Sequence, residues 1–169
     1  MHSIPAVIDA LRRAPEIVVP LVREVPSSIL KRRPTPRRWS AHEHACHLMH
    51  VHALFFDRLE YMLAEPAPVI QPYLPGDHDP DDFLLRLDLD ASMDRFVAER
   101  RRLVARLETL GPSDWARTAD HGEYRLYSVF IMFRHLVLHD FLHAYRIEEL
   151  LLRPVWPASS DPLSSRDDG

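Results

Sequence analysis

The chain has 169 residues, about the size of one domain, and a domain of that size buries roughly 70% of the surface that its unfolded chain exposes. Hydrophobic residues make up 46% and charged residues 27%, which excludes a mostly disordered chain, a collagen-like fibre and a disulfide-rich mini-protein. The net charge of −4 argues against nucleic-acid binding, and no apolar run approaches the ~18 residues that span a bilayer, so we expect a cytoplasmic protein with no membrane partner.

A helical pattern covers residues 4–30, where apolar side chains recur every three or four positions. Pro15, Pro20 and Pro26 fall inside this pattern, and each removes a backbone N–H donor, so we predict a broken or kinked first helix. Residues 31–38 follow as a basic connector that contains prolines. Because this connector lacks interleaved aromatic residues, we interpret it as a solvated segment and not as a phosphate-binding one.

The second predicted helix has a clear start. Ser40, followed three residues later by Glu43, is typical of a capping box, in which each side chain satisfies a backbone N–H of the other residue. A stripe of apolar residues continues to about Ala64, where Pro66 ends the helix. Residues 65–87 are rich in proline and aspartate, and they predict an exposed coil or crossover that is unusually long for a helical bundle.

Two further helices follow the crossover. Asp88 or Asp90 can cap a third helix that runs to about Leu110, and a loop at 113–125 leads into a fourth helix at about 126–152.

No segment shows a convincing strand pattern. The pattern therefore predicts an all-α four-helix bundle over residues 1–153, with a long Pro-rich crossover between the second and third helices. We expect residues 154–169 to form a disordered polar tail.

The histidines are the most informative feature, because most of the 11 fall in two short stretches. On a helical wheel His47 lies at the edge of the core-facing side of the second helix, while His139 and His143 share the core stripe of the fourth. Two imidazoles one turn apart can reach one ion, and a facing helix can supply a third nitrogen. Because buried imidazoles without partners are costly, the pattern favours a divalent metal site formed by these three histidines over a metal-free core.

The other histidines carry weaker signals. His135, one turn before His139, is a candidate to line a substrate pocket. His42, His50 and His52 point away from the His47 side by varying amounts, and we interpret them as surface or interface residues.

The same residues resemble a known family. The segments Trp39-Ser40-x-x-Glu43-x-x-x-His47 and His139-Asp140-x-x-His143 resemble the DinB/YfiT family over about residues 4–152, in the same order and at similar separations. The resemblance implies a four-helix bundle with a crossover, a divalent metal held by His47, His139 and His143, and a homodimer. Related members include bacillithiol S-transferases and the mycothiol-dependent maleylpyruvate isomerase.

An ion held by three nitrogens keeps an open position for water or substrate, which is typical of catalytic sites. Such an ion can activate water for hydrolysis or hold a thiol as thiolate, and the residues do not choose between a hydrolase and a low-molecular-weight-thiol S-transferase. The alternative is a non-catalytic bundle that binds metal or a small ligand. Imidazole ligands suit zinc or nickel, with iron or manganese as further options.

Several residues near the three histidines are candidates for supporting roles. Glu43 and Asp140 could accept a ring N–H from a ligating histidine, although the capping box alone explains Glu43. Arg146 could hold an anionic substrate. We interpret Cys46 as a small packing residue, and as the single cysteine it excludes an intrachain disulfide.

These residues predict a pocket near the end of the bundle where the basic connector arrives. It would be lined by His135, His44 and Arg146, with Trp39 near its rim, and the 113–125 loop would lie farther from the ion. The crossover is long enough to fold back over that pocket as a lid.

Overall fold

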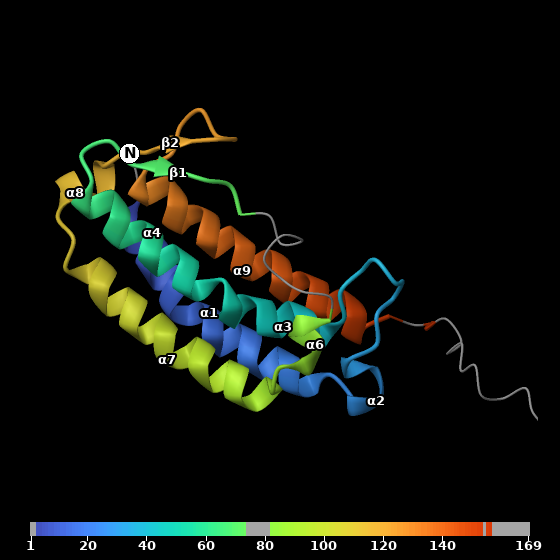
Figure 1. Ribbon diagram of the computed structural model, residues 1–169. Coiled ribbons are helices and arrows are strands. Elements are labelled where there is room, and N and C mark those ends of the chain that lie inside the picture. The colour runs from blue at the N-terminus through green and yellow to red at the C-terminus, as the bar shows by residue number, and fades with distance from the viewer. Residues whose placement is uncertain (1–2, 74–81, 154, 157–169) are drawn as a thin grey trace, which may run out of the picture.

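The computed structural model describes residues 3–73, 82–153 and 155–156, and it shows a four-helix bundle (Figure 1), which confirms the predicted fold. The bundle consists of α1 (Ile4–Glu24), α3 (Ala41–His50) continued by α4 (His52–Ala64), α7 (Leu89–Glu108) and α9 (Val129–Leu151). Helix α9 packs mainly against α1 and α3, while α7 packs against the other sides of the same two helices. In the described part of the chain no helix is long and apolar enough to cross a membrane.

Helix α1 runs without a break through Pro15 and Pro20, contrary to the expectation of a broken helix there. Pro20 is exposed on the side away from the core and Pro15 is half-buried beside the core stripe, whose side chains Val7, Leu11, Ala14, Val18 and Val22 are buried. Packing of this stripe therefore maintains the helix past two missing N–H donors. Only Pro26 marks a break, because α1 ends at Glu24 and the short α2 (Ser27–Leu30) follows.

Helix α3 begins with the predicted capping box. The Ser40 hydroxyl accepts from the Glu43 backbone N–H at 3.3 Å, and the Glu43 carboxylate accepts from the Ser40 backbone N–H at 2.8 Å. The second predicted helix is interrupted by a turn at Val51, which separates α3 from α4. The capping box therefore predicted the start of the helix correctly, whereas the apolar stripe did not reveal the turn at Val51.

The crossover and the loop before α9 contain short elements that the sequence pattern did not predict. Strand β1 (Val69–Ile70) pairs in parallel with β2 (Asp120–His121), with Val69 opposite Asp120 and Ile70 opposite His121. Strands of two residues are too short to show an alternating pattern. This pairing ties the crossover to the loop, at the end of the bundle opposite α2 (Figure 1).

Further short helices flank the bundle. Helix α6 (Phe83–Arg86) precedes α7, and α8 (Pro112–Ala116) follows it. Asp88 caps α7, as one of the two predicted residues, and Ser128 caps α9, which therefore starts three residues later than expected. Most of the predicted tail lies outside the described residues, but the Trp156 ring lies beneath the guanidinium groups of Arg32 and Arg153.

Two histidines that we expected at the surface are buried. His42 and His52 are each only 1% exposed, so that expectation was wrong for both. His42 is covered by the segment around Leu84, and its Nε2 lies 3.5 Å from the Cys46 sulfur. His52 lies near Arg100 of α7. A helical wheel missed both because it shows the face of a helix but not the segments that later cover that face.

A buried ion pair joins α7 to α9. Arg100 and Asp140 are both at most 1% exposed, and the Arg100 guanidinium donates to both carboxylate oxygens of Asp140. A third donation reaches the Leu11 carbonyl oxygen at 3.3 Å, so this arginine also contacts α1. Two desolvated charges are stable there only because each satisfies the other.

Removing one partner of this pair should therefore destabilise the fold far more than replacing both. We expect Arg100→Met to lower the free energy of unfolding by about 3–5 kcal/mol, because it leaves the Asp140 carboxylate buried and unpaired. The double variant Arg100→Met, Asp140→Leu should recover most of that loss. Urea denaturation measures both, with Arg101→Met as the exposed control, and equal destabilisation by Arg100→Met and Arg101→Met would contradict the assignment.

Candidate metal centre

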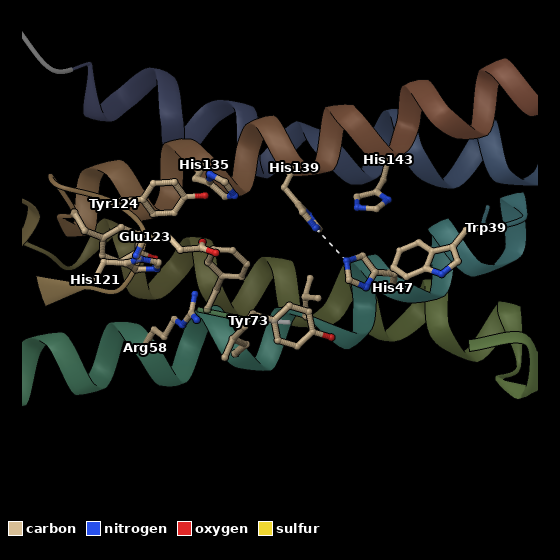
Figure 2. Close-up of a pocket in the computed structure, with 14 residues that line it drawn as sticks. Trp39, His47, Arg58, Tyr73, His121, Glu123, Tyr124, His135, His139 and His143 are labelled. Atoms are coloured by element: carbon tan, nitrogen blue, oxygen red, sulfur yellow. Dashed lines mark hydrogen bonds between the residues drawn. The ribbon is translucent and has the colours of Figure 1, made fainter. Parts of the chain in front are cut away.

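Three histidines from two facing helices meet inside the bundle (Figure 2). His47 comes from α3, while His139 and His143 lie one turn apart on α9, and candidate ligand atoms of all three lie within 4.8 Å of one another. The Nε2 atoms of His47 and His139 are 3.1 Å apart. The structure thus brings together the three residues that the sequence predicted as ligands.

This arrangement fits a divalent ion. Two nitrogen ligands of a tetrahedral ion, each at about 2.1 Å, lie roughly 3.4 Å apart, close to the separation of the His47 and His139 nitrogens. The Nδ1 atoms of both rings are buried, and neither has a hydrogen-bond partner among the described residues. Metal ligation through Nε2 would compensate in part for enclosing these polar rings.

Burial keeps these imidazoles neutral at neutral pH. It lowers the pKa of His47 to about 3 and that of His139 to about 4, and neighbouring histidines contribute to both shifts. The pKa of His143 is lowered as well, first by burial and then by His139 and His47. A neutral imidazole offers the lone pair that a metal ion needs, so no proton has to leave before the ion binds.

Aromatic packing holds the rings in place. The indole of Trp39 stacks on the His143 ring at 5.9 Å between centroids, and it contacts the His47 ring at 4.7 Å. His44, which we predicted to line the pocket, lies beside His143 instead, with its Nδ1 2.8 Å from the Nδ1 of His143. A hydrogen bond between these two Nδ1 atoms would fix the orientation of the His143 ring.

The histidine cluster opens into a cavity of about 340 Å³ between α4, α9 and the β2 loop. Figure 2 shows His47 and Trp39 at one end and His121, Glu123 and Arg58 at the other. Aromatic and apolar side chains form much of the wall between these ends. The lining residues are Trp39, His47, Val51, Leu54, Phe55, Arg58, Tyr73, His121, Glu123, Tyr124, Tyr127, His135, His139 and His143.

The predicted pocket was right in two of its four members. His135 and Trp39 line the cavity, but His44 and Arg146 line a separate groove on the far side of the indole. Arg146 is exposed there and pairs with Glu149 of its own helix at 2.6 Å, so it does not face the histidine cluster. Trp39 lines both spaces and therefore separates them.

The two acidic candidates contact other groups. Glu43 holds the capping box and pairs with Arg33, while Asp140 pairs with Arg100, and no contact between either carboxylate and a ligating imidazole is found in the described part of the chain. Cys46 is buried, and burial raises the pKa of its thiol, in line with a packing role.

The sequence analysis missed the far end of the cavity. His121, Glu123 and Tyr124 come from the 113–125 loop, which lies away from the histidine cluster as expected but still forms a wall of the same cavity. The β1–β2 pairing holds that loop beside α4, where Arg58 donates to the Gln71 carbonyl oxygen. The only sequence signal was the concentration of aromatic residues and histidine at 121–127.

Comparisons with known proteins agree with this geometry. The DinB superfamily model matches residues 10–147. A solved structure of YfiT from Bacillus subtilis, described as a probable metal-dependent hydrolase with an unusual four-helix bundle topology, superposes with a TM-score of 0.80. The two chains are 22% identical, and the match covers 91% of this chain and 89% of YfiT. No curated protein matches the chain.

The histidine cluster and these comparisons support binding of a divalent metal ion, which can be measured directly. We expect the purified protein to take up about one zinc or nickel ion per chain and to melt at a higher temperature when it is loaded. His139→Ala should lose most of the metal, because two remaining imidazoles hold an ion weakly. Elemental analysis and thermal melts provide the measurements.

His121→Ala is the matched control, because His121 lines the same cavity at the opposite end. It should keep its metal. A wild-type protein that takes up neither ion, or an equal loss of metal in both variants, would contradict a site at His47, His139 and His143.

Proposed function

The chain belongs to the DinB superfamily, and we propose that it is a metal-dependent hydrolase of small molecules. One observation carries the proposal: three neutral imidazoles converge at the inner end of a cavity of about 340 Å³, where one ion could contact both protein and substrate. YfiT, which has the same fold, is described as a probable metal-dependent hydrolase, and this supports the choice of reaction.

The residues at the histidine end of the cavity would bind the ion and shield it from solvent. His47, His139 and His143 would hold the ion and leave at least one coordination position open to the cavity. When bound, a divalent ion supplies Lewis-acid chemistry, polarising a carbonyl group and lowering the pKa of water. Trp39 and Phe55 shield this end with apolar surface, which strengthens electrostatic interactions within it.

The cavity walls indicate the kind of substrate. Tyr73, Tyr124 and Tyr127 offer ring surface for an apolar or aromatic body. At the far end Arg58 donates to the Gln71 carbonyl oxygen and hydrogen-bonds with Tyr127, and because a guanidinium has five N–H donors, others remain for an anionic group. We therefore propose a small substrate with an apolar body and an acidic end, its reacting bond lying toward the histidines.

A second reaction is favoured by what surrounds the histidine end. Among the described residues that line the cavity, the one carboxylate is Glu123, at the opposite end, and no cysteine is present. The described residues that line the histidine end of the cavity thus include no carboxylate that could act as a general base. A nucleophile that arrives with its own acidic proton, such as a low-molecular-weight thiol, suits this environment, so thiol transfer to a small electrophile is the second candidate.

One screen distinguishes these functions. We expect metal-loaded protein to hydrolyse members of a panel of aryl esters, amides and lactones without added thiol, and chelated protein or His139→Ala to lose that activity. Product formed only with a thiol and a haloaromatic electrophile would instead assign thiol transfer. Loaded protein that binds panel compounds but converts none would contradict both and leave a non-catalytic binding protein.

The acidic end of the substrate can be tested by binding alone. We expect Arg58→Ala to weaken binding of a small aryl carboxylate by about tenfold or more, because the carboxylate loses the guanidinium that pairs with it, and to leave binding of the matching amide unchanged. Calorimetry measures both compounds, and metal content should stay at the wild-type value. Arg95→Ala, at an exposed position of α7, is the control. Equal weakening of acid and amide would refute a role for the charge of Arg58.

A further inference from the structure

A second hollow lies behind Trp39, outside the histidine cavity. It has a volume of about 600 Å³ and lies between the basic connector before α3 and the C-terminal end of α9, which are neighbours in Figure 1. Trp39 lines both this hollow and the cavity. A volume of this size is typical of a small-molecule site, and the proposed hydrolysis does not use it.

The hollow is strongly basic, although the chain as a whole carries a net charge of −4. Among the described residues that line it, four are arginines and one is an acid. Arg37 and Arg38 come from the connector, Arg146 and Arg153 come from the end of α9 and the residues just after it, and the acid is Glu149. We call this hollow the arginine groove. Positive charge gathered on a concave surface raises the local concentration of anions.

Most of this charge is not compensated within the protein. Arg37 and Arg38 are exposed, and neither forms an ion pair in the described part of the chain. Arg153 donates from its Nε to a backbone carbonyl oxygen at 3.0 Å, which leaves its positive charge in place. Arg146 alone is paired, with Glu149 at 2.6 Å. Three positive charges of the arginine groove are therefore available to a ligand.

We propose that the arginine groove binds a small ligand with two linked phosphate groups and a flat ring system, which is the chemistry of a nucleoside diphosphate. Guanidinium groups bind phosphate oxygens through pairs of hydrogen bonds, and arginines on both walls suit more than one phosphate. Three uncompensated charges favour such an anion over a single carboxylate. Trp39 offers ring surface for the flat part of the ligand, and Leu150 and Leu152 add apolar surface.

The fold gives the basic connector a setting that its own residues do not indicate. Taken alone, residues 31–38 favour a solvated segment, because no aromatic residue lies between their charges. The fold brings Trp39 and two arginines from the C-terminal region against the same space. Arg146, which we expected beside the metal, contributes to this groove instead. The site is thus assembled from two segments that are distant in sequence.

A small molecule fits the groove better than a nucleic acid does. The volume of about 600 Å³ accommodates one such molecule. A strand of nucleic acid needs a basic surface that follows several nucleotides, and a net charge of −4 repels a long polyanion.

The groove is also separate from the proposed metal chemistry. It lies on the other side of Trp39 from the cavity that the three ligating histidines line. Because phosphate groups can also coordinate a metal ion, the test includes His139→Ala, which should lose most of the metal and keep the groove. Failure of the proposed hydrolase activity would therefore leave this site untouched, and the reverse holds as well.

Calorimetric titration with adenosine diphosphate at fixed ionic strength provides the test. We expect wild type and His139→Ala to bind it with the same affinity. Replacing Arg37 and Arg38 together by Gln should weaken binding by at least about tenfold, because two phosphate contacts are lost. The matched control replaces Arg101 and Arg102 by Gln, two adjacent exposed arginines of α7, and should bind as the wild type does. Circular dichroism should show the same helix content in all variants.

Further probes identify the occupant. Inorganic pyrophosphate should bind about tenfold more weakly than adenosine diphosphate, because it lacks the ring that would contact Trp39. Equal affinity of the two would overturn that ring contact. No binding of the diphosphate, equal weakening in both arginine pairs, or loss of binding in His139→Ala alone would overturn the site. A single-stranded oligonucleotide that binds more tightly than the diphosphate would overturn the small-molecule assignment.

Discussion

The rotation of α9 about its own axis determines where the important side chains of the bundle point. Asp140 must face Arg100 in the interior, and this single requirement fixes the helix. His139 and His143, its close neighbours along the chain, then face α3 and His47, while Phe141 faces outward. A shift by one residue would turn the helix by about 100°, expose a buried carboxylate and disperse the histidines.

This constraint explains why an interior built mainly of apolar side chains retains an ion pair. An apolar pair of similar volume would fill the same space and would be nearly as stable, but it would be compatible with several rotations of α9 about its axis. The pair between Arg100 and Asp140 is compatible with only one rotation of α9, because its hydrogen bonds require one geometry. We infer that it contributes specificity of arrangement more than stability, and that the geometry of the metal centre depends on it although neither residue contacts the histidine cluster in the described part of the chain.

Local patterns predicted the parts of the site that lie on long helices. The capping box at Ser40 set the start of α3, and helical spacing placed His47, His139 and His143 on faces that meet in the bundle. These signals depend on neighbours within a turn or two, which a sequence shows directly. The remainder depended on contacts between distant segments. Pairing of β1 with β2 brings His121 to the cavity, and the segment around Leu84 buries His42.

The two ends of the cavity are also built differently: packed helices form the proposed metal-binding end, and a loop forms much of the proposed substrate-binding end. The histidine end is built from α3 and α9, whose positions are fixed by core packing and a buried ion pair. The other end is built from a loop and a two-residue strand pair, which Arg58 joins to α4 through the Gln71 carbonyl oxygen. Loops tolerate substitution better than packed helices do. Residues such as Tyr124 and Glu123 can therefore change, and with them the shape and charge offered to a substrate, while the three imidazoles keep the positions that a metal ion requires.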